Sequence, residues 1–138
     1  MKEVFSQKHV YVVDDTSFMR RALVKLLEEL GFDKLKITEF ENGKAAWTAI
    51  TKETKPIDLI FTDWNMPQLN GIDFLRTVRA NGKHYKDVPI VMVTTVSEKE
   101  QVIEALKYRI SGYCLKPIEQ DKLLEVVFNL FLQDAENE

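Results

Sequence analysis

The sequence has 138 residues, a formal net charge of −3, 45% hydrophobic and 30% charged residues, which is the composition of one soluble globular domain. The negative charge argues against a nucleic-acid-binding surface, and no apolar run is long enough to span a bilayer. One cysteine, Cys114, excludes an internal disulfide, and residues 1–8 contain no signal-peptide core, so a cytoplasmic location is predicted. The two histidines, His9 and His84, lack the spacing of a zinc site.

The first half of the chain alternates short apolar runs with segments of helical spacing. A strand is predicted over residues 9–13, followed by a helix over 17–30 that Gly31 is suited to cap. Residues 35–40 begin with alternating apolar and polar side chains, which is typical of a strand with one wetter face. The Asn-Gly pair at 42–43 then opens a second helix.

The second half continues the same alternation. The apolar run at 57–62 predicts a buried strand, because it is too short for a helix, and a helix over 71–81 follows it. After a strand at 89–93, residues 97–100 match a capping box and predict that a helix begins there. A short strand at 112–115 precedes a last amphipathic helix. Its apolar residues are Leu123, Leu124, Val127, Leu130 and Phe131.

This order of elements predicts the fold class and the extent of the domain. Five strands alternating with five helices indicate an α/β protein with a parallel sheet covered by helices on both faces. No linker or repeat interrupts residues 9–132, which we predict to form one domain. Residues 1–8 are predicted to be an N-terminal extension, and the acidic residues 133–138 a tail that frays.

Chemically suitable side chains follow four of the predicted strands. Asp14 and Asp15 follow the first strand, Asp63 the third, Thr94 the fourth and Lys116 the fifth. Parallel strands all point the same way, so these groups converge on one edge of the sheet, where open α/β sheets bind ligands. Three carboxylates in one pocket repel one another unless a cation neutralises them, and oxygen ligands alone favour Mg²⁺. With an ammonium and a hydroxyl nearby, the pattern predicts Mg²⁺-assisted phosphoryl chemistry on a carboxylate nucleophile.

These motifs, in this order and at strand ends, resemble those of response-regulator receiver domains, most closely the single-domain chemotaxis type. The resemblance covers residues from about His9 to Leu132 and implies a flavodoxin-like sheet of strand order 2-1-3-4-5. The motifs that carry it are Asp14-Asp15, Thr62-Asp63-Trp64-Asn65-Met66-Pro67, Gly71, Thr94 and Lys116-Pro117.

The resemblance implies a role for each site residue. Asp63 accepts a phosphoryl group from a histidine kinase. Asp15, Asp63 and the main-chain carbonyl of Asn65 bind Mg²⁺, while Asp14 acts mainly through a water. Lys116 and the Thr94 hydroxyl bind the phosphoryl oxygens.

Further implications concern switching and output. Tyr113 resembles an aromatic switch residue that turns inward as Thr94 moves, and the fourth helix, fifth strand and fifth helix form the surface that binds a target protein. A cis peptide is implied between Lys116 and Pro117. Asn65 and Val96 occupy positions that tune dephosphorylation. Val96 departs from the polar or acidic group often found there, which predicts slower loss of the phosphoryl group.

Each motif alone has a plainer explanation. Asp14 and Asp15 could form a turn and helix cap, Thr94 could be a satisfied strand-end hydroxyl, and Lys116 could be a solvated lysine. Tyr113 could serve packing alone, and Cys114 is expected to be a small buried hydrophobe. Their joint occurrence favours the receiver interpretation over any of these.

An enzyme class and a carrier class are the alternatives to a signalling protein. An Mg²⁺-dependent aspartyl phosphatase needs an Asp as general acid two positions after its nucleophile, where this chain has Asn65. A flavodoxin-type flavin carrier would need a phosphate-binding loop where Asp14 and Asp15 stand. We therefore predict a receiver that catalyses only its own phosphorylation and dephosphorylation. With no output domain after the last helix, it would act through a partner. The leading candidate for that partner is a flagellar-motor switch. The alternative is that the protein is a phosphorelay shuttle or a kinase-regulating receiver.

Overall fold

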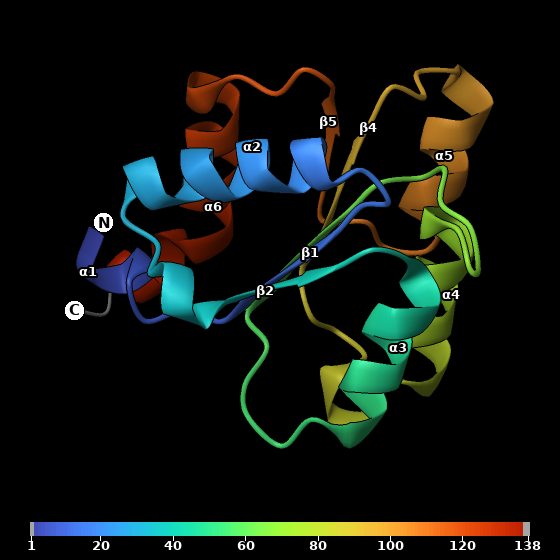
Figure 1. Cartoon of the computed structure of the whole chain (residues 1–138), viewed down its shortest axis with the longest axis horizontal. Coiled ribbons are helices and arrows are strands. Elements are labelled where there is room, and N and C mark those ends of the chain that lie inside the picture. The colour runs from blue at the N-terminus through green and yellow to red at the C-terminus, as the bar shows by residue number, and fades with distance from the viewer. Residues whose placement is uncertain (1, 137–138) are drawn as a thin grey trace.

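The computed structural model describes residues 2–136, with side chains through Leu132, as a twisted parallel sheet between two layers of helices (Figure 1). The sheet order is β2-β1-β3-β4-β5, which confirms the predicted flavodoxin-like topology. All four neighbouring pairs are parallel. The strands are β1 (Val10–Val13), β2 (Ile37–Phe40), β3 (Leu59–Thr62), β4 (Ile90–Thr94) and β5 (Gly112–Leu115).

Each face of the sheet buries its own apolar cluster against its own helices. On one face, strand residues such as Ile60 and Met92 pack with α3, α4 and α5; on the other, Phe61 and Val93 pack with α1, α2 and α6. The central strands β1, β3 and β4 are buried along their whole length, as expected of parallel strands covered on both faces. The helices are α1 (Lys2–Phe5), α2 (Ser17–Leu30), α3 (Gly43–Lys52), α4 (Gly71–Asn81), α5 (Lys99–Lys107) and α6 (Gln120–Glu136), with short 3₁₀ turns η1 (Lys34–Lys36) and η2 (Lys83–Tyr85).

The described residues contain one helix more than the five predicted. The additional helix is α1, within the predicted extension, and its Phe5 is 1% exposed. The Phe5 ring stacks on Phe32 at a centroid distance of 4.7 Å and meets Phe131 edge-on at 6.3 Å. Since these partners lie far along the chain, local periodicity could not predict that residues 2–5 pack into the core.

Further element boundaries differ from the prediction: β3, for example, begins at Leu59 rather than at residue 57. The second strand begins at Ile37, because residues 34–36 form η1, where the Asp33 side chain accepts a hydrogen bond from the Leu35 amide at 2.9 Å. The predicted capping box at 97–100 does not form. Instead α5 begins at Lys99, and Glu98 in its N-cap position makes no side-chain capping bond.

The C-terminal end of α2 and the N-terminal end of α3 follow the prediction, whereas the last helix runs further than predicted. Gly31 ends α2 in the left-handed conformation (φ 115°), and the Asn42 side chain caps α3 by accepting from the Ala45 amide at 2.8 Å. Helix α6 continues through Glu136, four residues into the predicted tail, and residues 137–138 of that tail lie outside the described part. None of the helices in residues 2–136 is long and apolar enough to cross a membrane.

Candidate functional site

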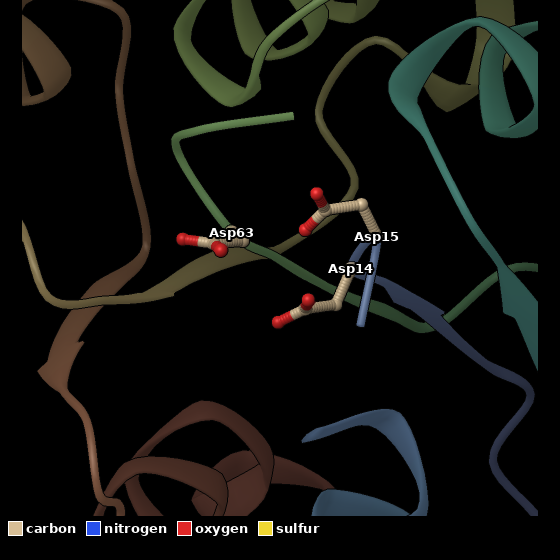
Figure 2. Close-up of side chains that lie close together, drawn as sticks. All are labelled: Asp14, Asp15 and Asp63. Atoms are coloured by element: carbon tan, nitrogen blue, oxygen red, sulfur yellow. The ribbon is translucent and has the colours of Figure 1, made fainter. Parts of the chain in front are cut away.

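Three carboxylates meet at the C-terminal edge of the sheet. Asp14 and Asp15 directly follow β1, and Asp63 directly follows the neighbouring strand β3; the last residues of the two strands, Val13 and Thr62, are register partners. One carboxylate oxygen from each aspartate lies within 4.8 Å of the others. Figure 2 shows the three side chains gathered beside the ends of these strands. The sequence-predicted cluster is therefore present in the fold.

The three carboxylates differ in burial and in hydrogen bonding. Asp14 and Asp63 are buried, whereas Asp15 is exposed. Asp14 Oδ1 accepts from the Thr16 amide at 2.9 Å, and Asp63 Oδ1 accepts from the Trp64 amide at 2.6 Å. These bonds fix the two buried carboxylates, while Asp15 points into the solvent-accessible part of the cluster.

Lys116, which directly follows β5 at the same edge of the sheet, connects the two buried carboxylates. Its Nζ donates to Asp14 Oδ2 at 2.7 Å and to Asp63 Oδ2 at 3.0 Å. Burial opposes the charge of the ammonium, but the bonds to Asp14 and Asp63 outweigh it and raise the pKa of Lys116 above its ordinary value. The lysine is therefore cationic at neutral pH. The peptide between Lys116 and Pro117 is cis, as the family resemblance implied.

Gly71 allows the loop after β3 to fold back on Asp63. The Gly71 amide donates to the Trp64 carbonyl at 2.7 Å, and a Cβ at this position would collide with the Asp63 carbonyl oxygen. A side chain here would displace the backbone that carries Asp63. Asn65, two residues beyond Asp63, is exposed in this loop.

The predicted hydroxyl and aromatic residues lie at the neighbouring strand ends. Thr94 is fully buried at the end of β4, and its Oγ1 accepts from the Val96 amide at 3.2 Å. Tyr113 on β5 is half-buried, and its hydroxyl donates to the Val96 carbonyl at 2.6 Å. The structure thus links both predicted switch residues through Val96, which is itself 8% exposed.

Sequence reasoning did not identify Arg20 as part of this site. Its guanidinium donates to the main-chain carbonyl of Asp14 at 2.6 Å and pairs with Glu39 at 3.1 Å, so it holds the start of α2 and the end of β2 beside the cluster. Nothing in the local pattern distinguishes Arg20 from the adjacent Arg21, since the distinction lies in the direction each side chain takes from the helix.

The donor set of the cluster fits a hard divalent cation. Three carboxylates and the single ammonium of Lys116 give the cluster a net charge of −2. Because Asp15 is exposed, the cluster can be reached from the solvent. The only cysteine, Cys114, belongs to the apolar cluster on the α2 and α6 face and contributes no soft ligand. Carboxylates without imidazole or thiolate are the ligands of Mg²⁺ or Ca²⁺ rather than of zinc.

Fold and site together define the class: a flavodoxin-like α/β protein with a carboxylate cluster and a lysine at the C-terminal edge of its parallel sheet. Such an edge is the ligand-binding position of open α/β sheets. Residues 10–128 match the response regulator receiver domain family, and the chain belongs to that family.

Named relatives and a solved structure agree with this assignment. The chain is 44% identical over 114 residues to a chemotaxis protein CheY homolog of Campylobacter jejuni, covering 83% of this chain and 85% of that protein. It is 40% identical over 116 residues to chemotaxis protein CheY1 of Helicobacter pylori, covering 83% and 89%. The structure of chemotaxis protein CheY4 of Vibrio cholerae superposes with a TM-score of 0.77 at 28% identity, covering 89% of this chain and 98% of that one.

Proposed function

We propose that this protein is a receiver of a chemotaxis two-component pathway that accepts a phosphoryl group on Asp63 and thereby changes its affinity for a partner. One observation carries the proposal: Asp63 directly follows β3 within the carboxylate cluster, and its Oδ2 accepts a hydrogen bond from Lys116 at 3.0 Å. Asp14 also accepts from Lys116, at 2.7 Å, so the choice of Asp63 as the acceptor follows the family motif around it, whereas Asp15 has no ammonium beside it in the described structure.

The chemistry follows from the charges around Asp63. A carboxylate oxygen of Asp63 attacks the phosphorus of a kinase phosphohistidine, so that a P–O bond forms and the P–N bond breaks. The bonding pair stays on the ring nitrogen, and neutral imidazole leaves because its other nitrogen already carries a proton. The Lys116 ammonium, 3.0 Å from Asp63 Oδ2 in the unphosphorylated protein, would donate to one phosphoryl oxygen. The Thr94 hydroxyl would donate to a second phosphoryl oxygen once it has left the Val96 amide. Attack of water on the acyl phosphate later releases phosphate and restores the carboxylate.

Mg²⁺ is the cation we propose for the cluster. Asp15, Asp63 and the Asn65 main-chain carbonyl would hold it, with Asp14 contributing through a water, as the family resemblance implies. When bound, the cation neutralises charge that develops on the transferred phosphoryl group. The exposure of Asp15 and Asn65 leaves these two ligands open to the solvent from which a hydrated ion arrives.

A surface of α5, β5 and α6 is the proposed target-binding face. In the family pattern these are the fourth helix, the fifth strand and the fifth helix. The helix numbers differ by one because α1 precedes the helix that the family pattern counts as its first. In Figure 1, β5 is an edge strand with α5 on one side and α6 on the other. Exposed apolar side chains on this face are Ile103 (42%), Leu106 (60%), Leu115 (51%), Leu124 (40%) and Phe128 (39%). Such a concentration favours a protein partner.

The chemotaxis output is supported by the names of relatives at 40% and 44% identity that align over most of this chain. A flagellar-motor switch protein is accordingly the proposed target, and a chemotaxis histidine kinase the proposed donor. Expression in a motile bacterium that lacks its own receiver tests this output. Flagellar reversal should change with the wild-type chain and not with Asp63→Asn; equal reversal frequencies with both chains would refute the chemotaxis assignment.

The modification itself is tested with purified protein. Incubation with Mg²⁺ and a small phosphodonor, followed by intact-protein mass spectrometry, should give one phosphoryl adduct in the wild type and none in Asp63→Asn. Asp121→Asn is the matched control, because Asp121 is an exposed aspartate on α6 that is not one of the three clustered carboxylates. A full yield of phosphorylated Asp63→Asn would show that another residue is the acceptor.

A further inference from the structure

The end of the sheet opposite the carboxylates carries a set of adjoining hollows. They lie among the segments that lead into β2, β3 and β4, and in Figure 1 the loop from α3 to β3 swings out below the sheet at this end. The first hollow, of about 240 Å³, is lined by Leu35, Lys36 and Lys55 among others. The second, about 320 Å³, shares Lys55 and adds His84, and the third, about 400 Å³, shares His84 and adds Lys83.

Because neighbouring hollows share lining residues, they form one furrow, which we call the basic furrow and define by Leu35, Lys36, Glu53, Lys55, Lys83 and His84. Its three lysines form no ion pair within the described residues, and Lys55 and Lys83 are exposed. Three more exposed lysines stand beside it in sequence. They are Lys34, Lys52 and Lys86.

The carboxylates near the basic furrow are already engaged within the protein. Glu53, the only carboxylate that lines it, accepts hydrogen bonds from the Tyr11 hydroxyl at 3.1 Å and from the Lys55 amide at 3.0 Å. Asp58 accepts from the His9 amide at 2.8 Å, and Asp87 pairs with Arg109 at 2.7 Å. Glu53 and Asp58 keep their negative charges, but the six lysines in and beside the furrow outnumber Asp33, Glu53 and Asp58, so this end of a chain whose net charge is −3 is positively charged.

Leu35 places an apolar side chain among these cations. It is 93% exposed on η1, between Lys34 and Lys36, and the bond from its amide to the Asp33 side chain holds the turn that presents it. An isolated exposed leucine needs no explanation by itself. At the mouth of a concave, positively charged furrow, it adds a contact that suits a protein side chain.

We propose that the basic furrow binds an acidic segment of a partner protein, whose carboxylates face Lys36, Lys55 and Lys83 and whose apolar side chain packs on Leu35. This site is separate from the carboxylate cluster, and it gives the protein a second contact that does not depend on phosphorylation. A peptide fits the site better than a membrane, because the surface is concave and presents a single large exposed apolar side chain. Duplex nucleic acid would have to approach a chain of net negative charge with few phosphate contacts.

Fluorescence anisotropy with a short labelled peptide of repeating Glu-Glu-Leu tests the proposal at physiological salt. The triple variant Lys36→Gln/Lys55→Gln/Lys83→Gln should bind about tenfold more weakly than wild type, since three attractive charge contacts are lost. The matched control is Lys25→Gln/Lys44→Gln/Lys99→Gln, which changes the net charge equally at exposed lysines outside the furrow. That control should keep wild-type affinity, and equal weakening in both triples would overturn the proposal.

Three further arms separate the parts of the proposal. Leu35→Ser should weaken binding of the Glu-Glu-Leu peptide and leave binding of an all-Glu peptide of equal charge unchanged. Asp63→Asn should bind the peptide as wild type does, so that the result is independent of the proposed phosphorylation. Absence of saturable peptide binding, or tighter binding to anionic phospholipid vesicles or to duplex DNA, would refute an acidic protein segment as the ligand.

Discussion

The Tyr113 hydroxyl donates a 2.6 Å hydrogen bond to the main-chain carbonyl of Val96. The Val96 amide in turn donates to Thr94 Oγ1, so one residue joins the aromatic ring on β5 to the hydroxyl at the end of β4. Burial, followed by the charges of Glu98 and Asp63, raises the pKa of Tyr113, which keeps its hydroxyl protonated. Movement of Thr94 toward a phosphoryl group would therefore break or shift a bond that positions Tyr113.

Removing the Tyr113 hydroxyl should loosen this connection. Tyr113→Phe is expected to lower the free energy of unfolding by about 1 kcal/mol, the net value of one hydrogen bond, and to speed exchange of the Val96 amide. Urea denaturation and amide hydrogen exchange measure the two effects. The Gly71 amide, bonded to the Trp64 carbonyl in another loop, is the internal control. Unchanged exchange at Val96 would show that the bond does not hold the loop.

Lys116 should stabilise the fold most when divalent cations are absent. Its side chain is 12% exposed between Asp14 (8%) and Asp63 (10%), and removing it leaves two buried carboxylates unpaired. In EDTA, Lys116→Met is expected to lose about 2–4 kcal/mol of unfolding free energy, because broken buried ion pairs are costly. Mg²⁺ should restore part of this loss by binding only the folded cluster.

The control for Lys116 is Lys99→Met, at an exposed lysine with no ion pair in the described structure. Chemical denaturation of both variants with EDTA and with Mg²⁺ gives the comparison. If the deficit of Lys116→Met were the same in both conditions, the lysine and the cation would not be compensating the same charge.

The site was largely predictable because its residues stand at strand ends. Asp14, Asp63 and Lys116 each end an apolar run, and parallel topology alone brings such positions to one edge of a sheet. What the pattern could not supply is the pairing between them: Lys116 bonds to Asp14 across 102 positions of sequence. Likewise Arg20 contacts the Asp14 carbonyl only because of the direction its side chain takes.

The missed parts of the fold have similarly specific causes. Helix α1 is too short for a periodic pattern and is stabilised by Phe5 against Phe32 and Phe131, contacts that only the folded chain creates. Leu35 begins an alternating run, yet the Asp33 side chain bonds to its amide and turns the chain before β2. A local side-chain to backbone bond here overrides the hydrophobic pattern.

Tyr11 should make the protein sensitive to high pH. Burial, followed by the charge and hydrogen bond of Glu53, raises the pKa of Tyr11 in the folded state. Above about pH 10 the unfolded chain loses this proton while the folded chain keeps it, so the free energy of unfolding falls as pH rises. Between about pH 10 and 11 the wild type should lose about 1 kcal/mol more than Tyr11→Phe. Denaturation curves that stay parallel for the two proteins would contradict this.

Val96 should prolong the phosphorylated state. Its side chain is 8% exposed, so a glutamate there would bury a charge, whereas Val96→Thr keeps the shape and adds one hydroxyl. The hydroxyl can orient an attacking water, and the lifetime of the phosphoryl group should shorten, though by less than the ~100-fold of a true general base. The rate of dephosphorylation is measured as the loss of the phosphoryl group from the protein over time in the presence of Mg²⁺. A longer lifetime in Val96→Thr would mean that the apolar side chain does not shield the group.

Asp15 provides the last prediction, because it adds a third negative charge beside a single lysine. Asp14 and Asp63 both bond to Lys116, whereas Asp15 is exposed and has no such partner in the described structure. In EDTA, Asp15→Ala should therefore have a higher Tm than wild type. The gain in unfolding free energy should be at most about 1 kcal/mol, since solvent screens an exposed charge. The same variant should lose most of the Mg²⁺-dependent increase in Tm, because the cation loses a ligand.

Thermal melts with EDTA and with Mg²⁺ separate these two effects of Asp15, and Asp121→Ala, an exposed aspartate on α6, controls for the change in net charge. A lower Tm than wild type in EDTA would show that the three carboxylates do not repel one another in the folded state. A normal Mg²⁺ shift in Asp15→Ala would remove Asp15 from the proposed metal site. Asp15→Ala is expected to have a higher Tm than wild type in EDTA and a smaller Mg²⁺-dependent increase in Tm. A variant that simply folds poorly would have a lower Tm in EDTA, so poor folding cannot imitate this result.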